Sequence, residues 1–208
     1  MNSLFDGILH FQEHDYEQNK EYFQTIGRKQ NPHTLFIGCS DSRIVPSLIT
    51  NTLPGELFVV RNIANIVPHY RLTGEYVATT SAVEYALNVL KIDNIVVCGH
   101  SNCGGCYALW DEGLLADVPH TRHWLELAAR VKDKVGRHFE GRPVDVRERE
   151  WLTEQYNIVE QMRHLLSYPG VKDRYKSGSL KVFGWYYIIE SGEVYNYDSA
   201  RELFDKVK

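Results

Sequence analysis

Three short apolar runs constrain the fold of this chain more than any other feature of its sequence. They occupy residues 34–38, 57–60 and 94–98, and each has the length of a strand. Runs that are apolar at successive positions are typical of strands buried on both faces of a parallel sheet. Between the second and third runs, residues 74–91 carry apolar side chains at helical spacing. The order strand, helix, strand predicts an α/β fold with a central, mostly parallel β-sheet flanked by helices.

Helical and alternating patterns complete a single predicted domain that spans residues 1–208. Near the start, apolar residues recur at helical spacing until Gly27, which predicts a helical arm that packs on a partner or on the far side of the domain. Near the other end, two apolar stretches joined through Ser191 and Gly192 resemble a hairpin. The additional elements expected are the N-terminal helical arm at 1–28, helices at 119–138 and 149–167, and a C-terminal hairpin at 180–197.

Composition and charge argue against several classes of protein. A chain of 208 residues with 43% hydrophobic residues can bury an adequate core without disulfides. A net charge of −4 without a basic stripe gives no support for nucleic-acid binding. No stretch approaches the roughly 20 apolar residues that cross a bilayer, and the first residues lack a signal-peptide pattern. We therefore expect a soluble, cytoplasmic protein that binds neither nucleic acid nor membrane.

The cysteines favour metal binding or reduced thiols over disulfides. Four cysteines are sparse for a disulfide scaffold in a chain of this length. Three of them, Cys98, Cys103 and Cys106, lie within nine positions. Cys98 ends an apolar run, so it is interpreted as a packed core thiol.

Two short segments supply ligands of the kind that bind zinc. Cys39 directly follows the first predicted strand, and His100 and Cys103 follow the third. The crevice outside the carboxyl ends of parallel strands is where open α/β sheets form their sites, so these three side chains are expected to converge. Three protein ligands with a fourth position left to water are typical of catalytic zinc, whereas structural zinc has four protein ligands.

Asp41 and Arg43 lie two and four residues beyond Cys39. A carboxylate beside a zinc-bound water either binds the metal itself or accepts the proton of the water and orients it. A neighbouring guanidinium favours the second role and lowers the pKa of Asp41. Two thiolates and a neutral imidazole cancel the charge of Zn²⁺, so we predict that activity rises from neutral to alkaline pH.

The combination Cys-x-Asp-x-Arg followed by His-x-x-Cys resembles the signature of the β-class carbonic anhydrases. The likeness is strong over residues 30–110, where segments 54–65, 81–86 and 99–105 share it. It implies an enzyme, a lyase, that hydrates carbon dioxide reversibly to bicarbonate and a proton. In that reaction a zinc-bound hydroxide, oriented by a catalytic dyad, attacks carbon dioxide. The implied dyad is Asp41 and Arg43, and the implied ligands of one Zn²⁺ per chain are Cys39, His100 and Cys103.

The same resemblance implies a substrate pocket that is mostly apolar, because carbon dioxide carries no charge. Gln30, nine residues before Cys39, is expected to donate a hydrogen bond to substrate across a dimer interface, and the backbone N–H of Gly104 is expected to face bicarbonate. A contact across an interface implies a homodimer or a dimer of dimers, which is a homotetramer. The residues expected to form the apolar wall are Phe58, Ile63 and Tyr85.

One position distinguishes subtypes within the family. Some bacterial members carry a tryptophan three residues before the first zinc cysteine, as part of a noncatalytic bicarbonate site that switches the enzyme off. Here that position is Phe36, which has no N–H donor, although Arg61 is present. We therefore expect the plant-like, open-site subtype, in which Asp41 stays paired with Arg43.

Other functions stay open from the sequence. A related hydrolase would attack carbonyl sulfide or carbon disulfide with the same zinc hydroxide. A zinc-dependent sensor or structural module would bind the metal without turning over carbon dioxide. A thiol oxidoreductase would use Cys103 and Cys106 as a redox pair. Among the histidines, His120 and His123 are expected to face solvent, and a proton-shuttle role for them is a hypothesis.

Overall fold

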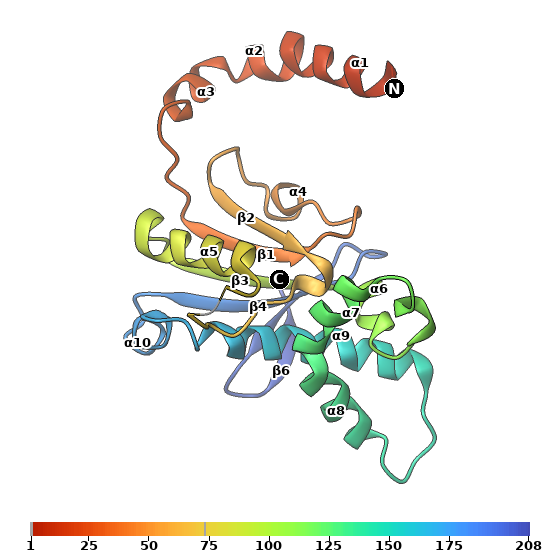
Figure 1. Ribbon diagram of the computed structural model, residues 1–208. Coiled ribbons are helices and arrows are strands. Elements are labelled where there is room, and N and C mark those ends of the chain that lie inside the picture. The colour runs from red at the N-terminus through yellow and green to blue at the C-terminus, as the bar shows by residue number, and fades with distance from the viewer. Residues whose placement is uncertain (1, 73) are drawn as a thin grey trace.

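A six-stranded sheet forms the centre of the protein (Figure 1). The computed structural model describes residues 2–72 and 74–208, so Met1 of the expected arm lies outside the described residues. The strand order is β2-β1-β3-β4-β5-β6, in which the first four strands are parallel and the last two run antiparallel to their neighbours. The mostly parallel α/β fold is therefore confirmed. The strands are β1 (Thr34–Cys39), β2 (Leu57–Asn62), β3 (Asn94–His100), β4 (Lys181–Tyr187), β5 (Val194–Asp198) and β6 (Leu203–Lys206).

Helical segments precede β1 and connect β1 to β2, β2 to β3, and β3 to β4. The helices expected at 119–138 and 149–167 are present, the first as three consecutive helical segments. None of the helices within residues 2–72 and 74–208 combines the length and apolar composition needed to cross a membrane. The helical segments are α1 (Asn2–His10), η1 (Phe11–Asp15), α2 (Tyr16–Gln18), α3 (Lys20–Ile26), α4 (Pro46–Thr50), η2 (Ile63–Asn65), α5 (Val77–Tyr85), η3 (Ala86–Leu90), α6 (Gly104–Ala108), η4 (Gly113–Leu115), α7 (Pro119–Leu125), η5 (Glu126–Ala128), α8 (Ala129–His138), α9 (Val146–Leu165) and α10 (Val171–Lys176).

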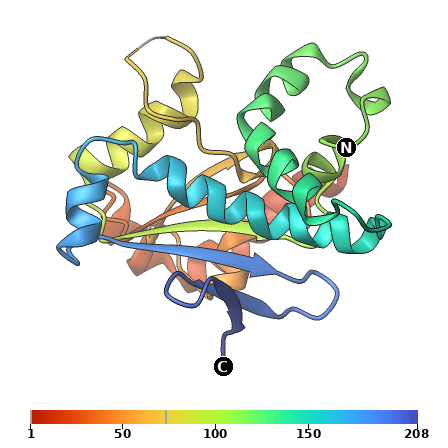
Figure 2. The same cartoon turned by 90° about the horizontal axis from the view of Figure 1, so that it is seen from below.

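The main core lies between the sheet and the helices α5 and α9. Alternate residues of β1 point to opposite faces, so Leu35 and Ile37 pack with Val83 of α5 and Ile158 of α9. Phe36 lies on the other face in a smaller cluster with aromatic residues of β4. Figure 2 shows α9 running along the sheet. Burial on both faces explains why the sequences of β1 and β3 are apolar at successive positions.

Close packing of α9 on β3 depends on glycine at position 99. A Cβ atom added to Gly99 would lie 2.7 Å from Cγ1 of Ile158, closer than side chains approach. Gly99 directly precedes His100, the last residue of β3. The glycine therefore brings α9 close to the end of the strand where the predicted ligands lie.

Strand β2 differs from the expectation of a fully buried strand. It lies at the edge of the sheet, pairs with β1 and is half-buried, and Val59 is 43% exposed. An apolar run alone does not distinguish an edge strand from a central one. At the opposite side, the predicted hairpin is present as β4 and β5, and β6 extends it.

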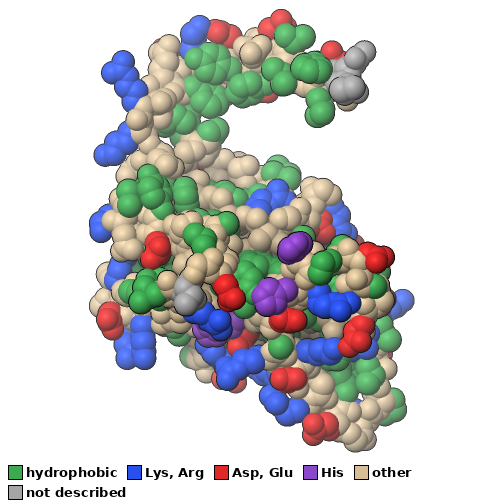
Figure 3. Space-filling model, in the orientation of Figure 1, with side chains coloured by type: hydrophobic (Ala, Val, Ile, Leu, Met, Phe, Trp, Pro, Cys, Tyr) green, Lys and Arg blue, Asp and Glu red, His purple; other side chains and the backbone are tan. Residues whose placement is uncertain are grey.

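The N-terminal arm is helical, as predicted, and extends away from the sheet (Figure 1). Its last helix is anchored by Tyr22, whose hydroxyl donates to the carbonyl oxygen of Pro54 over 2.8 Å. Farther out, the side chains of Leu4 and Phe5 are 74% and 64% exposed. Figure 3 shows hydrophobic side chains gathered along the arm. The arm therefore leaves apolar surface uncovered by its own chain.

Candidate active site

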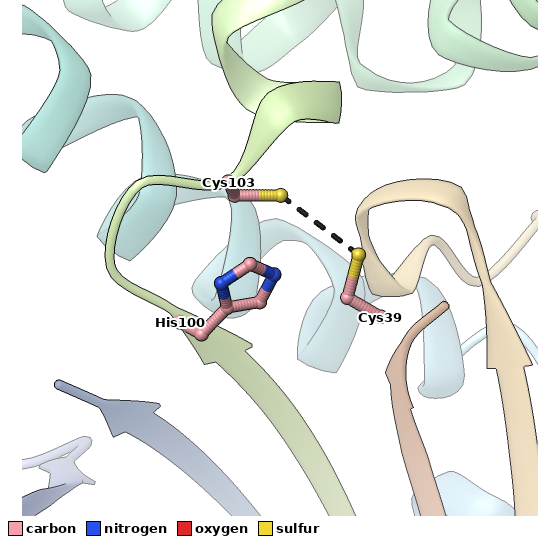
Figure 4. A group of neighbouring side chains, drawn as sticks. All are labelled: Cys39, His100 and Cys103. Atoms are coloured by element: carbon pink, nitrogen blue, oxygen red, sulfur yellow. Dashed lines mark hydrogen bonds between the residues drawn. The ribbon is translucent and has the colours of Figure 1, made fainter. Parts of the chain in front are cut away.

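The three predicted ligands converge at the carboxyl ends of β1 and β3 (Figure 4). Cys39 ends β1, His100 ends β3, and Cys103 follows in the turn that leads into α6. Their potential ligand atoms all lie within 4.8 Å of one another, and the three side chains are buried. Parallel pairing of β1 with β3 brings these positions together, because it places both carboxyl ends at the same edge.

The His100 ring presents one free nitrogen toward the two thiols. Nδ1 lies 2.9 Å from the carbonyl oxygen of Ser101, which accepts hydrogen bonds but cannot donate them. Nδ1 therefore carries the proton, and Nε2 keeps its lone pair. Nε2 is buried without a hydrogen-bond partner among the described residues. A second hydrogen bond that fixes the ring in this way is typical of metal-binding histidines.

The two thiols also fit a zinc ion. Their sulfur atoms are 4.0 Å apart, and tetrahedral coordination at Zn–S distances of about 2.3 Å separates two sulfurs by about 3.8 Å. The hydrogen bond with Cys103 and burial raise the pKa of Cys39 to about 12. The hydrogen bond with Cys106, together with burial, raises the pKa of Cys103. Ionising both thiols therefore requires a nearby positive charge, which a divalent cation held by these ligands would supply.

Asp41 forms a bidentate ion pair with Arg43 beside these ligands. The Nε and Nη2 atoms of Arg43 donate to the two carboxylate oxygens over 2.9 and 2.7 Å. These hydrogen bonds hold the pKa of Asp41 well below its usual range. One oxygen of Asp41 lies 3.9 Å from Nε2 of His100. The carboxylate is therefore next to the ligand cluster while it is hydrogen-bonded to Arg43.

Further hydrogen bonds join the two ligand segments into one unit. Arg61 of β2 donates to the backbone carbonyl oxygens of Cys39 and Asp41 over 2.9 and 2.6 Å. Arg43 donates to the carbonyl oxygen of Asn102, between the other two ligands, over 3.1 Å. The backbone on both sides of the site is therefore held by guanidinium groups.

Two of the five predicted substrate-binding residues lie beside the ligands of the same chain. Gly104 directly follows Cys103 at the start of α6. Ile63 adjoins this helix, because a Cβ added to Gly105 would lie 2.9 Å from Cγ2 of Ile63. Ile63 is 41% exposed, so its side chain remains available to line a pocket.

The other three, Gln30, Phe58 and Tyr85, lie elsewhere on the chain. Phe58 is opposite Leu35 in the sheet, whereas Cys39 is opposite Asn62. Four residues of strand separate these levels, a distance of about 13 Å. The rings of Phe58 and Tyr85 are 5.9 Å apart, and Tyr85 shares a groove of about 780 Å³ with Gln30. Within one chain, these three residues therefore form a second cluster toward the amino ends of the strands.

A buried carboxylate that the sequence analysis did not identify supports the site. Glu154 of α9 is 5% exposed, and one of its oxygens accepts the backbone N–H of Cys103 over 2.9 Å. Its other oxygen accepts the hydroxyl of Tyr186 over 2.7 Å. Burial raises the pKa of Glu154 to about 7. Glu154 is 51 residues from Cys103, so no local pattern could connect them.

The remaining cysteines and histidines take different places. Cys98 is buried on the other face of the sheet with Phe36, as expected for a core thiol. Cys106 is buried next to Cys103 but lies outside the three-ligand group. His123 is exposed and hydrogen-bonded to Glu126. The shuttle role of His123 stays a prediction.

Comparison with a family of known function agrees with this geometry. Residues 34–194 match the model of the family described as carbonic anhydrase. The match begins at the first residue of β1 and ends at the first residue of β5. It therefore contains both ligand segments and the strands that position them.

Relatives and solved structures of high similarity cover nearly the whole chain. A carbonic anhydrase of Helicobacter pylori is 41% identical over 98% of this chain and 93% of the relative. Carbonic anhydrase 1 of Escherichia coli O157:H7 is 37% identical over 98% and 91%. The structure of the β-carbonic anhydrase CcaA superposes with a TM-score of 0.93 at 34% identity, covering 100% of this chain and 92% of that one. The fold, the site and these similarities together show that the chain is an enzyme of the β-class carbonic anhydrase family.

Proposed function

We propose that this enzyme catalyses the reversible hydration of carbon dioxide to bicarbonate and a proton, and that it uses Zn²⁺. One observation carries the proposal: the buried ligand atoms of Cys39, His100 and Cys103 converge beside a carboxylate that Arg43 engages. The similar proteins named above are carbonic anhydrases, which supports the same reaction here. A zinc ion held by the three ligands would lower the pKa of a coordinated water toward about 7.

Asp41 and Arg43 are proposed as the catalytic dyad. The ionised Asp41 carboxylate accepts a hydrogen bond from the attacking water and so orients it toward carbon dioxide. Arg43 keeps this carboxylate ionised, because its guanidinium donates to both oxygens. The same two hydrogen bonds hold the carboxylate against the guanidinium, which competes with metal binding and still leaves a lone pair on Asp41 for the water.

This pairing supports the open-site, plant-like subtype as a proposal. Phe36 is fully buried among apolar side chains and offers no donor for a bicarbonate ion. Arg61 is engaged with backbone carbonyl oxygens. A crystal structure of the zinc-bound enzyme at neutral pH with Asp41 as a fourth ligand would contradict this subtype.

We also propose that a second copy of the chain completes the substrate pocket. Gln30, Phe58 and Tyr85 are too far along the strands to reach Cys39 of their own chain, so these residues serve the ligands of a partner. The carbonic anhydrases of Sordaria macrospora, which superpose with a TM-score of 0.81 at 30% identity over 94% of this chain and 95% of that one, are described as tetrameric. A homodimer or a dimer of dimers is therefore proposed here.

The exposed apolar side chains of the arm lead to a prediction about this assembly. Replacing Leu4 and Ile8 together by glutamate should convert the oligomer to monomers, because a buried interface does not tolerate unpaired charges. We expect carbon dioxide hydration to fall at least about 10-fold as the shared pocket is lost. Light scattering coupled to size-exclusion chromatography measures the mass, and stopped-flow assays measure the rate.

The control for this prediction is Glu17→Ala in the same arm. Glu17 pairs with Lys20 on the exposed surface, so its removal should change neither mass nor rate. An oligomer that survives the double glutamate substitution would show that the arm is not part of the interface.

Stopped-flow measurement of carbon dioxide hydration tests the proposed function. Zinc-loaded enzyme should release protons from dissolved carbon dioxide, and removal of zinc by a chelator should stop the reaction. Full zinc content without hydration would contradict the proposal and favour a zinc-dependent sensor. Faster turnover of carbonyl sulfide or carbon disulfide than of carbon dioxide would assign the site to the related hydrolase.

The ligand set predicts how the rate depends on pH. Two thiolates and a neutral imidazole cancel the charge of Zn²⁺, so the water loses its proton less readily than in an all-histidine site. The rate should therefore rise from neutral to alkaline pH. Asp41 does not cause this rise, because Arg43 holds the pKa of Asp41 well below its usual range and the carboxylate stays ionised. A rate profile that is flat between about pH 6.5 and 9 would disprove the prediction.

A reducing compartment is proposed for the enzyme. All four cysteines are free thiols, and two of them must stay reduced to act as metal ligands. The cytoplasm provides such conditions.

A further inference from the structure

We propose that Glu190 is a positioning residue that holds the loop between His100 and Cys103 and, through this loop, Arg43. The inference rests on the proposed function, because it assigns Glu190 a role in the same zinc site. Glu190 lies in the turn between β4 and β5, 88 residues beyond Asn102. No local sequence pattern connects Glu190 with the predicted ligands.

Both oxygens of the Glu190 carboxylate bind the loop. The hydroxyl of Ser101 donates to one oxygen over 2.9 Å, and the side-chain amide of Asn102 donates to the other. Ser101 and Asn102 are the two residues that separate His100 from Cys103. One carboxylate therefore holds the whole connection between two of the three proposed zinc ligands.

Backbone hydrogen bonds attach the same loop to the end of β4. The N–H of Ser101 donates to the carbonyl oxygen of Tyr187 over 2.9 Å. The hydroxyl of Ser101 accepts the N–H of Ile189 over 3.0 Å while it donates to Glu190. Ser101 is 7% exposed, so its own N–H and hydroxyl are shielded from water, whereas Glu190 and Asn102 lie at the exposed surface.

Asn102 needs such support because of its backbone conformation. Its φ angle is +55°, in the left-handed region that residues other than glycine seldom adopt. A residue in this region persists where its surroundings hold it in place. The side-chain amide of Asn102 is held by Glu190, and its carbonyl oxygen accepts Nη2 of Arg43 over 3.1 Å.

A continuous set of hydrogen bonds therefore runs from Glu190 to the proposed dyad. Asn102 joins Glu190 to Arg43, and Arg43 donates to both oxygens of Asp41. A carboxylate suits the first position, because it accepts at both oxygens and its two partners are both donors. A glutamine there would accept at one atom only, and its N–H group would end the hydrogen bond that Ser101 or Asn102 donates to the other oxygen.

The experiment measures zinc release from the zinc-loaded enzyme into a chromogenic chelator in excess. Glu190→Gln should release zinc about 10-fold faster than the parent, the effect typical of partners that orient a metal ligand. We also expect kcat for carbon dioxide hydration to fall while KM stays unchanged, because the variant disturbs the dyad and not the substrate pocket. The matched control is Glu193→Gln in the same turn. Glu193 pairs with Tyr195 and Lys206 and should leave both zinc release and kcat unchanged.

A second variant removes the other partner of the Glu190–Asn102 hydrogen bond. In Asn102→Gly, the glycine adopts the positive φ angle without strain, and the side-chain amide that Glu190 binds is absent. If Glu190 acts through Asn102, the two substitutions should not act independently. The increase in the zinc release rate of the double variant should then be smaller than the product of the increases in the two single variants. Full multiplication, or a zinc release rate for Glu190→Gln equal to that of Glu193→Gln, would overturn the proposal. A parent enzyme that binds zinc but does not hydrate carbon dioxide would refute the proposed function, whereas zinc release would still decide the role of Glu190.

Discussion

Cys39→Ser should remove zinc from the enzyme and abolish carbon dioxide hydration. Cys39 is one of three proposed protein ligands, and the serine hydroxyl is a harder and far less acidic group than a thiol. The loss of zinc affinity should exceed the roughly 10- to 100-fold losses caused by residues that only orient a ligand. Metal analysis of the purified variant measures zinc content, and stopped-flow assays measure the rate.

The matched control is Cys98→Ala. Cys98 is also a buried thiol, on β3 next to β1, but it lies on the opposite face of the sheet from the ligand cluster. This variant should keep one zinc per chain and nearly the full rate, with a modest loss of stability from the missing sulfur. Equal zinc content in the two variants would show that Cys39 is not a ligand.

Asp41→Asn should lower kcat by about 100- to 1,000-fold while zinc stays bound, because an amide is a much poorer proton acceptor than a carboxylate. The variant has nearly the same shape as the parent, and one of its side-chain atoms still accepts from Arg43. The amide group turns a donor toward the second guanidinium N–H, which also weakens the pair. The expected combination, full zinc content with a low rate, separates the role of Asp41 from that of the ligands.

Asp111→Asn provides the same chemical change outside the site. Asp111 accepts the backbone N–H groups of Gly113 and Leu114 through one oxygen, and asparagine can do the same. Its zinc content and rate should match those of the parent. An Asp41→Asn variant as active as this control would remove Asp41 from the mechanism. Loss of zinc from Asp41→Asn would instead indicate that the carboxylate contributes to metal binding.

Much of the sheet and of the ligand set was predictable because the signals are local. Runs such as 34–38 and 94–98 are apolar at each core position, and they form the buried strands β1 and β3. The edge position of β2 was not predictable, because an apolar run does not reveal how many neighbours a strand has. The pairing of β4 with β3 likewise joins segments far apart in sequence.

The sequence by itself determined the chemistry available at the carboxyl ends of β1 and β3. Cys39, Asp41 and Arg43 lie within five consecutive positions, and His100 and Cys103 within four. Over such short separations the backbone leaves few arrangements, so residue type and spacing predict a ligand set with a paired carboxylate.

The tertiary structure alone decided what surrounds that chemistry. Strand register placed Phe58 about 13 Å along the sheet from the level of Cys39, and this separation is the reason for proposing that a second chain completes the pocket. Packing of α9 on β3 brought Glu154 to Cys103, and the turn after β4 brought Glu190 to Asn102. Contacts between residues 51 and 88 positions apart depend on how whole elements pack, which no local pattern encodes.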